Sequence, residues 1–136
     1  MVIRIYSTIE GTQLHELRRG LEYANIYSLS FDPSSQFLAM SCDSGSVHIF
    51  SLAKENVEIK NPTSKFRFLK HFVPYFDSEW CFAKFKGNDN NRTRVGFIAN
   101  GESSLSVLNY KGEMFTLGFD RLKGGECKKG NVYEIL

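Results

Sequence analysis

The sequence lacks the features that mark several large classes of protein. Its longest apolar runs are far shorter than the roughly 20 residues that a membrane-spanning helix needs. Its first residues show no basic segment followed by an apolar one, so no secretory signal is visible. The three cysteines, Cys42, Cys81 and Cys127, are widely spaced and form neither a disulfide framework nor a zinc-ligand pattern. We therefore expect reduced thiols in a cytosolic protein.

Charge and motif content exclude further classes. A formal net charge of +2 is too small for a general nucleic-acid binder, so any recognition of anions must be local. The acidic residues are scattered, no nucleophile stands in a recognisable motif, and no glycine-rich phosphate loop is present. The histidines form no metal-ligand pattern with the cysteines. We predict a protein that is not an enzyme, binds no nucleic acid and uses no metal or cofactor.

The residues that are present predict a folded, all-β chain. Hydrophobic residues make up 42% of the sequence and aromatic residues 14%, which is enough for the core of one domain. No long stretch has the apolar period of an amphipathic helix. Short apolar runs instead alternate with turn residues. In the first part of the chain the expected strands are 3–7, 14–17, 26–31, 37–41 and 47–51.

One five-residue pattern occurs twice in this part. Residues 3–7 and 47–51 share the order apolar, basic, apolar, aromatic, serine, at an offset of 44 (47 minus 3). That offset falls within the period of about 40–45 residues that is typical of WD-repeat propeller blades. The repeat, the strand lengths and the turns together predict a β-propeller.

The signal weakens after residue 52 and then returns. A polar stretch followed by an aromatic and basic one predicts a loop at about 53–78. Strands are expected at 80–85, 95–99, 105–110, 113–119 and 132–136, with a tight hairpin turn at Lys111-Gly112. At four strands a blade, this gives about two and a half blades of a partial propeller. Its open edge strands favour self-association, cover by another chain or continuation in a longer protein.

Two adjacent arginines, Arg18 and Arg19, end an expected strand and precede Gly20. Successive side chains on a strand point to opposite sides, so the two guanidinium groups cannot easily serve one pocket. Guanidinium groups bind phosphate bidentately, which indicates a pair of anion sites on either side of the strand. A solvated surface pair is the alternative. We also expect Gly20 and Gly45 to meet a need for positive φ or for close approach.

With these residues laid out, the chain resembles the PROPPIN family, the phosphoinositide-binding WD-repeat propellers that include the WIPI autophagy proteins. The resemblance runs through residues 3–6, through Leu-His-Glu-Leu-Arg-Arg-Gly at 14–20, through 24–28, and through Ser-Cys-Asp-Ser-Gly-Ser-Val-His-Ile-Phe at 41–50. Residues 74–85 look like a stretch of the short-loop WIPI branch. The arginine motif with its flanks is the specific part of the match.

The resemblance implies a seven-bladed propeller of which this chain is the C-terminal part. Residues 1–20 would be the second half of blade five, 21–86 blade six with its loop at about 53–78, and 87–136 blade seven. It implies a non-enzymatic scaffold that is cytoplasmic and peripheral on autophagic, endosomal or vacuolar membranes. There it would bind phosphatidylinositol 3-phosphate and phosphatidylinositol 3,5-bisphosphate and meet other autophagy proteins.

The family's functional positions carry over onto five residues as phosphoinositide-binding residues: Arg18, Arg19, Ser41, Ser46 and His48. Arg18 would face the blade-five pocket, and Arg19 the blade-six pocket with the two serines and the histidine. Cys42 stands where a second serine is common, which removes a donor. The residues that complete the pocket of Arg18 would precede Met1, so we expect that site to be incomplete. The alternative roles are a structural hydrogen bond for the histidine and backbone capping for the serines.

The aromatic and basic part of the loop has two interpretations. In the family, the loop before the last strand of blade six can insert into a bilayer, and Phe66, Phe68 and Leu69 would supply that contact. Neighbouring basic residues would meet anionic lipid. The alternative is that the aromatic side chains pack under the propeller. We favour packing from Pro74 onward and leave both interpretations open for residues 66–69.

A second function is compatible with the same residues. The chain would then be a WD-repeat scaffold for protein–protein interaction without lipid binding, and its arginines would contact an acidic peptide or solvent. Concave pockets with converging hydroxyl groups would favour the lipid. Guanidinium groups paired with Glu16, Glu22 or Asp43 would favour the protein scaffold.

Overall fold

The computed structural model describes residues 1–136 except residues 21, 53–78, 88–91 and 100–102. Within the described residues the chain forms twelve β-strands and one short 3₁₀ turn. The strands are β1 Val2–Tyr6, β2 Gln13–Arg18, β3 Ile26–Phe31, β4 Phe37–Cys42, β5 Val47–Ser51, β6 Glu79–Trp80, β7 Ala83–Phe85, β8 Thr93–Phe97, β9 Ser104–Asn109, β10 Glu113–Gly118, β11 Gly125–Glu126 and β12 Lys128–Glu134. In this described part no helix is long and apolar enough to cross a membrane.

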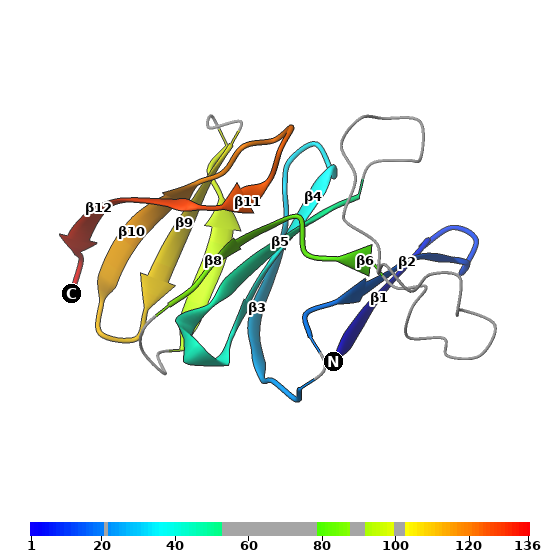
Figure 1. The fold of residues 1–136 in the computed structure, drawn as a ribbon, viewed down its shortest axis with the longest axis horizontal. Helices are drawn as coiled ribbons and strands as arrows, with labels where there is room; N and C mark the ends of the chain where they lie inside the picture. Colours follow the sequence, from blue (N-terminus) through cyan, green and yellow to red (C-terminus); the bar gives the residue numbers. More distant parts are fainter. Residues whose placement is uncertain (21, 53–78, 88–91, 100–102) are drawn as a thin grey trace.

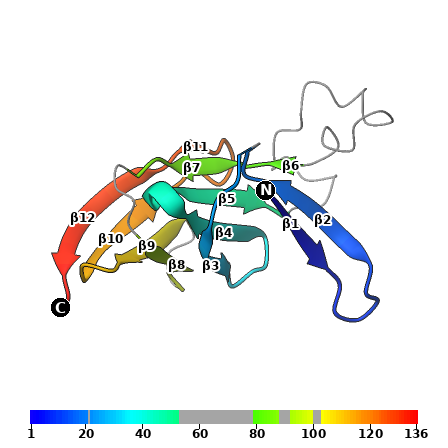
Figure 2. The ribbon, with the colours of Figure 1, turned by 90° about the horizontal axis from the view of Figure 1, so that it is seen from below.

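The strands form three sheets, and two short strands, β6 and β11, join the sheet that precedes them. The first sheet is β1-β2-β6, the second is β3-β4-β5-β7 with β11 added beyond β7, and the third is β8-β9-β10-β12 (Figure 1). Figure 2 shows the sheets placed one after another along an arc, with both ends of the arc open. Sheets built mainly from antiparallel meanders and placed along an arc are the architecture of a partial β-propeller. The prediction of an all-β, partial propeller is therefore confirmed.

The sequence repeat marks equivalent strands. Its first copy lies on β1 and its second copy is β5. Each of these strands pairs antiparallel with the next strand of its own sheet, β1 with β2 and β5 with β7. The shared pattern thus encodes one structural position in two successive sheets.

Between β5 and β7 of the second sheet, the chain contributes the short strand β6 to the first sheet, and this corrects one prediction. A single strand over 80–85 is wrong, because β6 pairs in parallel with β2 whereas β7 pairs with β5. The chain changes sheets at Cys81 and Phe82, where the amide of Phe82 donates to the carbonyl of Ile49 at 2.8 Å. In the same way β11 pairs in parallel with β7 before β12 joins the third sheet. Gly124 is required there, since a Cβ atom would overlap the carbonyl oxygen of Phe82.

Two apolar cores hold the three sheets together. The core between the second and third sheets contains Phe37, Ala39, Val47, Ile49, Phe82, Ala83, Val95, Leu105, Val107, Phe115, Leu117 and Phe119. The core between the first and second sheets contains Leu17, Leu38, Met40 and Phe50. Alternate residues of β4 and β5 therefore face different neighbours, so both faces of the second sheet are buried.

Several local predictions can be compared with the structure. The hairpin turn is confirmed, with Gly112 at φ 83° and its amide donating to the carbonyl of Asn109. The last strand begins earlier than predicted, at Lys128. Gly45 has φ 66° as predicted, but the prediction for Gly20 is wrong because that residue has neither positive φ nor a close neighbour.

The three cysteines are free thiols. The loop at 53–78, with Phe66, Phe68 and Leu69, lies outside the described residues.

Candidate functional site

The two arginines diverge at the end of β2, as the strand geometry predicts. Leu17 is fully buried in the core between the first and second sheets. Arg18 points to the opposite face, where Glu16 also lies. Arg19, one residue beyond the strand, returns to the side of the second sheet and forms an ion pair with Asp43. The two guanidinium groups thus lie on different sides of the first sheet.

Arg18 lies in a small charged cluster on the outer face of the first sheet. Its Nη2 atom is 3.7 Å from Oε1 of Glu16, and the Nε atom of Arg4 is 3.0 Å from Oε2 of the same carboxylate. The side chain of Arg18 is 16% exposed. One carboxylate therefore lies between two guanidinium groups.

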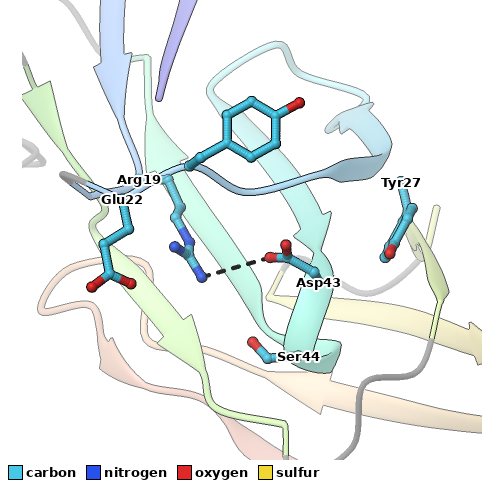
Figure 3. Close-up of a pocket in the computed structure, with 6 residues that line it drawn as sticks. Arg19, Glu22, Tyr27, Asp43 and Ser44 are labelled. Carbon is cyan, nitrogen blue, oxygen red and sulfur yellow. Dashed lines mark ion pairs between the residues drawn. The ribbon is translucent and has the colours of Figure 1, made fainter.

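Arg19 lines a cleft of about 530 Å³ where the first and second sheets meet. The cleft is lined by Arg19, Glu22, Tyr23, Tyr27, Asp43 and Ser44. In Figure 3 the guanidinium group points toward Asp43, with Ser44 below it and Glu22 on its other side. The cleft is a polar, open site with one arginine at its centre.

The contacts of Arg19 leave part of its hydrogen-bonding capacity unused. Its Nη2 atom is 3.9 Å from Oδ1 of Asp43, longer than the 2.7–2.9 Å typical of a charge-assisted hydrogen bond. Its Nε atom is buried and has no hydrogen-bond partner in the described part of the chain. Because buried donors are normally paired, an unpaired guanidinium N–H marks a place for an acceptor.

A tight turn carries the other polar groups of the cleft. Residues 43–45 form the 3₁₀ turn between β4 and β5, with Ser44 in the left-handed region at φ 65°. The backbone amide of Asp43 donates to the carbonyl of Asn25, and the amide of Asn25 donates to Oδ2 of Asp43. These bonds fix the turn against the segment that follows Arg19. The hydroxyl oxygens of Ser44 and Ser46 are 2.7 Å apart, so they share one hydrogen bond and leave a second hydrogen to donate.

His48 lies behind this turn on the face of β5 that is turned toward the first sheet. It is directly opposite Met40, which belongs to the core between those two sheets. Both ring nitrogens are buried, and neither has a hydrogen-bond partner among the described residues. Burial, and then the positive charges of Arg19 and Lys84, lower the pKa of His48 to about 4. The imidazole is therefore neutral near neutral pH, with one N–H donor available.

The lowered pKa predicts an acid-dependent loss of stability. The unfolded chain takes up a proton at His48 near the ordinary pKa of about 6.5, whereas the folded chain does so only near 4. The stability that this histidine contributes is therefore present above about 6.5 and is lost as pH falls toward 4, by on the order of 3 kcal/mol. Urea unfolding at several pH values checks this. His48→Gln removes that part of the acid loss. Equal slopes for wild type and His48→Gln would refute it.

Ser41 is not brought together with the other predicted residues. On β4 it lies directly opposite Val47, so both side chains face the third sheet. Its hydroxyl is fully buried and donates to the carbonyl of Thr93 at 2.6 Å. Arg19, Ser46 and His48 share the interface between the first two sheets, whereas Ser41 belongs to the next interface.

The cleft also contains residues that the sequence did not reveal as site residues. Asp43, Ser44, Glu22 and Tyr27 line it, although the sequence suggested only a turn at 43–45 and carboxylates that compete for the arginines. The only indication of Ser44 in the sequence was that a hydroxyl residue stands in the middle of the predicted turn. Cys42 is fully buried, and this burial raises the pKa of its thiol. Among the described residues no three histidine, cysteine or acidic side chains converge to hold a metal.

Comparison with known proteins identifies the family. The profile of the PROPPIN family matches residues 1–72, more than half of the chain. The chain belongs to the PROPPIN family. The matched segment includes the double arginine, the turn at 43–45 and β5.

Similar proteins share this assignment. The chain is 29% identical to autophagy-related protein 18e of Arabidopsis thaliana over 92% of the chain and 33% of that protein. It is 32% identical to the WD repeat domain phosphoinositide-interacting protein 1 of Xenopus laevis over 93% of the chain and 33% of that protein. The chain thus spans about a third of the length of these PROPPIN relatives.

A solved structure supports the fold. A complex of KlAtg21 with the coiled coil of AgAtg16 matches 99% of the chain and 36% of that protein chain, with a TM-score of 0.69 and 19% identity. At this identity the likeness establishes a partial propeller and says nothing about ligands.

Proposed function

We propose that this PROPPIN chain binds the phosphorylated inositol headgroup of a membrane lipid in the Arg19 cleft. The observation that carries the proposal is that the Nε of Arg19 and the ring of His48 are both buried without a hydrogen-bond partner among the described residues, with Arg19 near enough for its charge to lower the pKa of His48. A phosphate group supplies acceptors for both donors at once. Ser44 and Ser46 add a hydroxyl hydrogen at the same side of the sheet. Arg19, Ser44, Ser46 and His48 then form the phosphate shell, and Ser41 supports the sheet behind it.

In the intact protein, Arg18 is proposed to serve a second headgroup on the opposite side of the first sheet. Two weak sites on one rigid domain would bind the same bilayer, and the affinity for the membrane would rise because the first contact raises the effective concentration for the second. The lipids are proposed to be phosphatidylinositol 3-phosphate and phosphatidylinositol 3,5-bisphosphate. The protein would then be a non-enzymatic, membrane-recruited scaffold of autophagy or endosomal traffic, cytoplasmic and peripheral on those membranes. The names of its relatives support this role.

A protein-interaction scaffold without lipid binding is the second candidate function. The carboxylates of Glu16 and Asp43 near the two arginines favour it, as does a relative solved with a coiled-coil partner. The distances of 3.7 and 3.9 Å weaken that argument, because such partly exposed ion pairs contribute little free energy and yield readily to a stronger anion.

The charge of Asp43 provides a test of the lipid function. Asp43→Asn keeps an acceptor for the amide of Asn25 but removes a negative charge beside Arg19. Removing a unit charge about 4 Å away is worth about 1 kcal/mol, so binding to vesicles with 3-phosphorylated phosphoinositide should rise about fivefold. Vesicle flotation at physiological salt measures this, with charge-matched phosphatidylserine vesicles for comparison.

The matched control is Glu134→Gln, which removes an exposed carboxylate on β12 of the third sheet and should leave flotation unchanged. A gain that is equal on phosphatidylserine vesicles, or no gain with a correctly folded variant, would contradict headgroup binding in the cleft.

A further inference from the structure

A row of charged and polar side chains continues from the Arg19 cleft across the second sheet. His48 on β5 lies directly opposite Lys84 on β7, and Lys84 lies directly opposite Glu126 on β11. Side chains of directly opposed residues point to the same face of a sheet. Because His48 faces the first sheet, Lys84 and Glu126 lie on that same face, on the outer side of His48.

Lys84 and Arg19 both act on the same imidazole. Each lowers the pKa of His48 through its positive charge, which places both cations within electrostatic reach of one ring. Directly opposed residues of neighbouring antiparallel strands have Cα atoms about 4.5–5.5 Å apart, so the ammonium stem starts one strand beyond the histidine. Two cations near a neutral imidazole that has no hydrogen-bond partner among the described residues form a site for an anion with more than one charged group.

The ion pair of Lys84 leaves its ammonium group available. Its Nζ atom is 3.8 Å from Oε1 of Glu126, and the two side chains are 55% and 69% exposed. An exposed pair at that distance is weak and screened by salt. A lysine also reaches different positions through its flexible stem. Lys84 can therefore turn from the carboxylate to a phosphate without breaking a buried contact.

We propose that Lys84 binds a second phosphate of the inositol ring whose first phosphate is held by Arg19, and so favours a headgroup with two ring phosphates over one. The inference rests on the proposed function, which supplies the first phosphate. Arg19, His48 and Lys84 form one continuous strip, with Arg19 at the cleft and Lys84 at the outer edge. Glu126 competes with the second phosphate for the ammonium group.

Soluble headgroups test this without the complication of a bilayer. Isothermal titration compares the binding of inositol 1,3-bisphosphate and inositol 1,3,5-trisphosphate to the chain. Besides the 1-phosphate, which carries the lipid tail in a phosphoinositide, the first compound has one ring phosphate and the second has two. Lys84→Gln should lower affinity for the trisphosphate about tenfold and affinity for the bisphosphate less than twofold. Glu126→Gln should raise affinity for the trisphosphate, and Lys84→Arg should retain it. Lys128→Gln, an exposed lysine on β12, is the matched control and should change neither.

The outcomes separate this inference from the proposed function. Equal losses for both headgroups, or no loss for either, would overturn the role of Lys84. The proposed function still stands in those cases if Arg19→Gln abolishes binding of the bisphosphate. If the wild-type chain binds neither headgroup while circular dichroism shows it folded, both proposals fail.

Discussion

Replacing Arg19 by glutamine lowers the affinity of the chain for vesicles with phosphatidylinositol 3-phosphate about a hundredfold or more. Arg19 is the one residue of the proposed phosphate shell that carries a positive charge. Each hydrogen bond from a guanidinium group to phosphate contributes about 1.5–3 kcal/mol, and a bidentate contact makes two. Glutamine keeps much of the side-chain length but has no charge. Vesicle flotation and titration with the soluble headgroup both measure the loss.

The matched control for this variant is Arg94→Gln. Arg94 is an exposed arginine on β8 of the third sheet and does not line the cleft. Its replacement should change binding less than twofold, and unfolding curves should show both variants folded. Equal losses for the two variants would mean that general positive charge, and not the Arg19 cleft, attracts the membrane.

Phe37→Ala lowers the free energy of unfolding by about 3–5 kcal/mol, the usual cost of truncating a buried phenylalanine. Phe37 is fully buried where the second and third sheets meet. Its ring centre lies 5.8 Å from that of Phe82 and 5.2 Å from that of Phe119, and the guanidinium carbon of Arg121 is 4.7 Å above it. The change removes contacts to two sheets at once. Urea unfolding measures the loss of unfolding free energy, and the melting temperature should fall by roughly 10–20 °C.

Phe31→Ala is the matched control, because Phe31 is on the neighbouring strand β3 and is 53% exposed. It should cost less than about 1 kcal/mol. If both variants lose the same small amount, the sheets do not pack through Phe37, and the contact between the second and third sheets is described wrongly.

Much of the fold follows from local sequence. Alternation and turn residues predicted β3 with its observed bounds and placed β4, β5, β9 and β10 within two residues. The same local signals failed where the structure depends on pairing between strands that are far apart in the sequence. The break between β6 and β7 arises because β6 pairs with β2 and β7 pairs with β5, and nothing in residues 79–85 alone indicates two different partners. The two-residue strand β11 is defined only by its pairing with β7.

The site was predictable in part for the same reason. Strand alternation correctly separates Arg18 from Arg19, and the spacing of two puts Ser46 and His48 on one face. Ser41 lies on another strand, so its face depends on the register of β4 with β5. The turn at 43–45 sets that register and places Ser41 opposite Val47 instead of His48. The cleft itself joins residues from the segment after β2 with the turn after β4, a proximity that only the packed sheets create.

The most direct test of the account observes the two unpaired groups themselves. Nuclear magnetic resonance of the isotope-labelled chain follows the side-chain Nε–H of each arginine and the ring nitrogens of each histidine during titration with inositol 1,3-bisphosphate. We predict saturable shifts at Arg19 Nε–H and at the ring of His48, with Arg94, Arg121 and His15 unchanged. Saturable binding with shifts elsewhere and none at Arg19 and His48, or no binding by the folded chain, would contradict the claim that this cleft holds the headgroup.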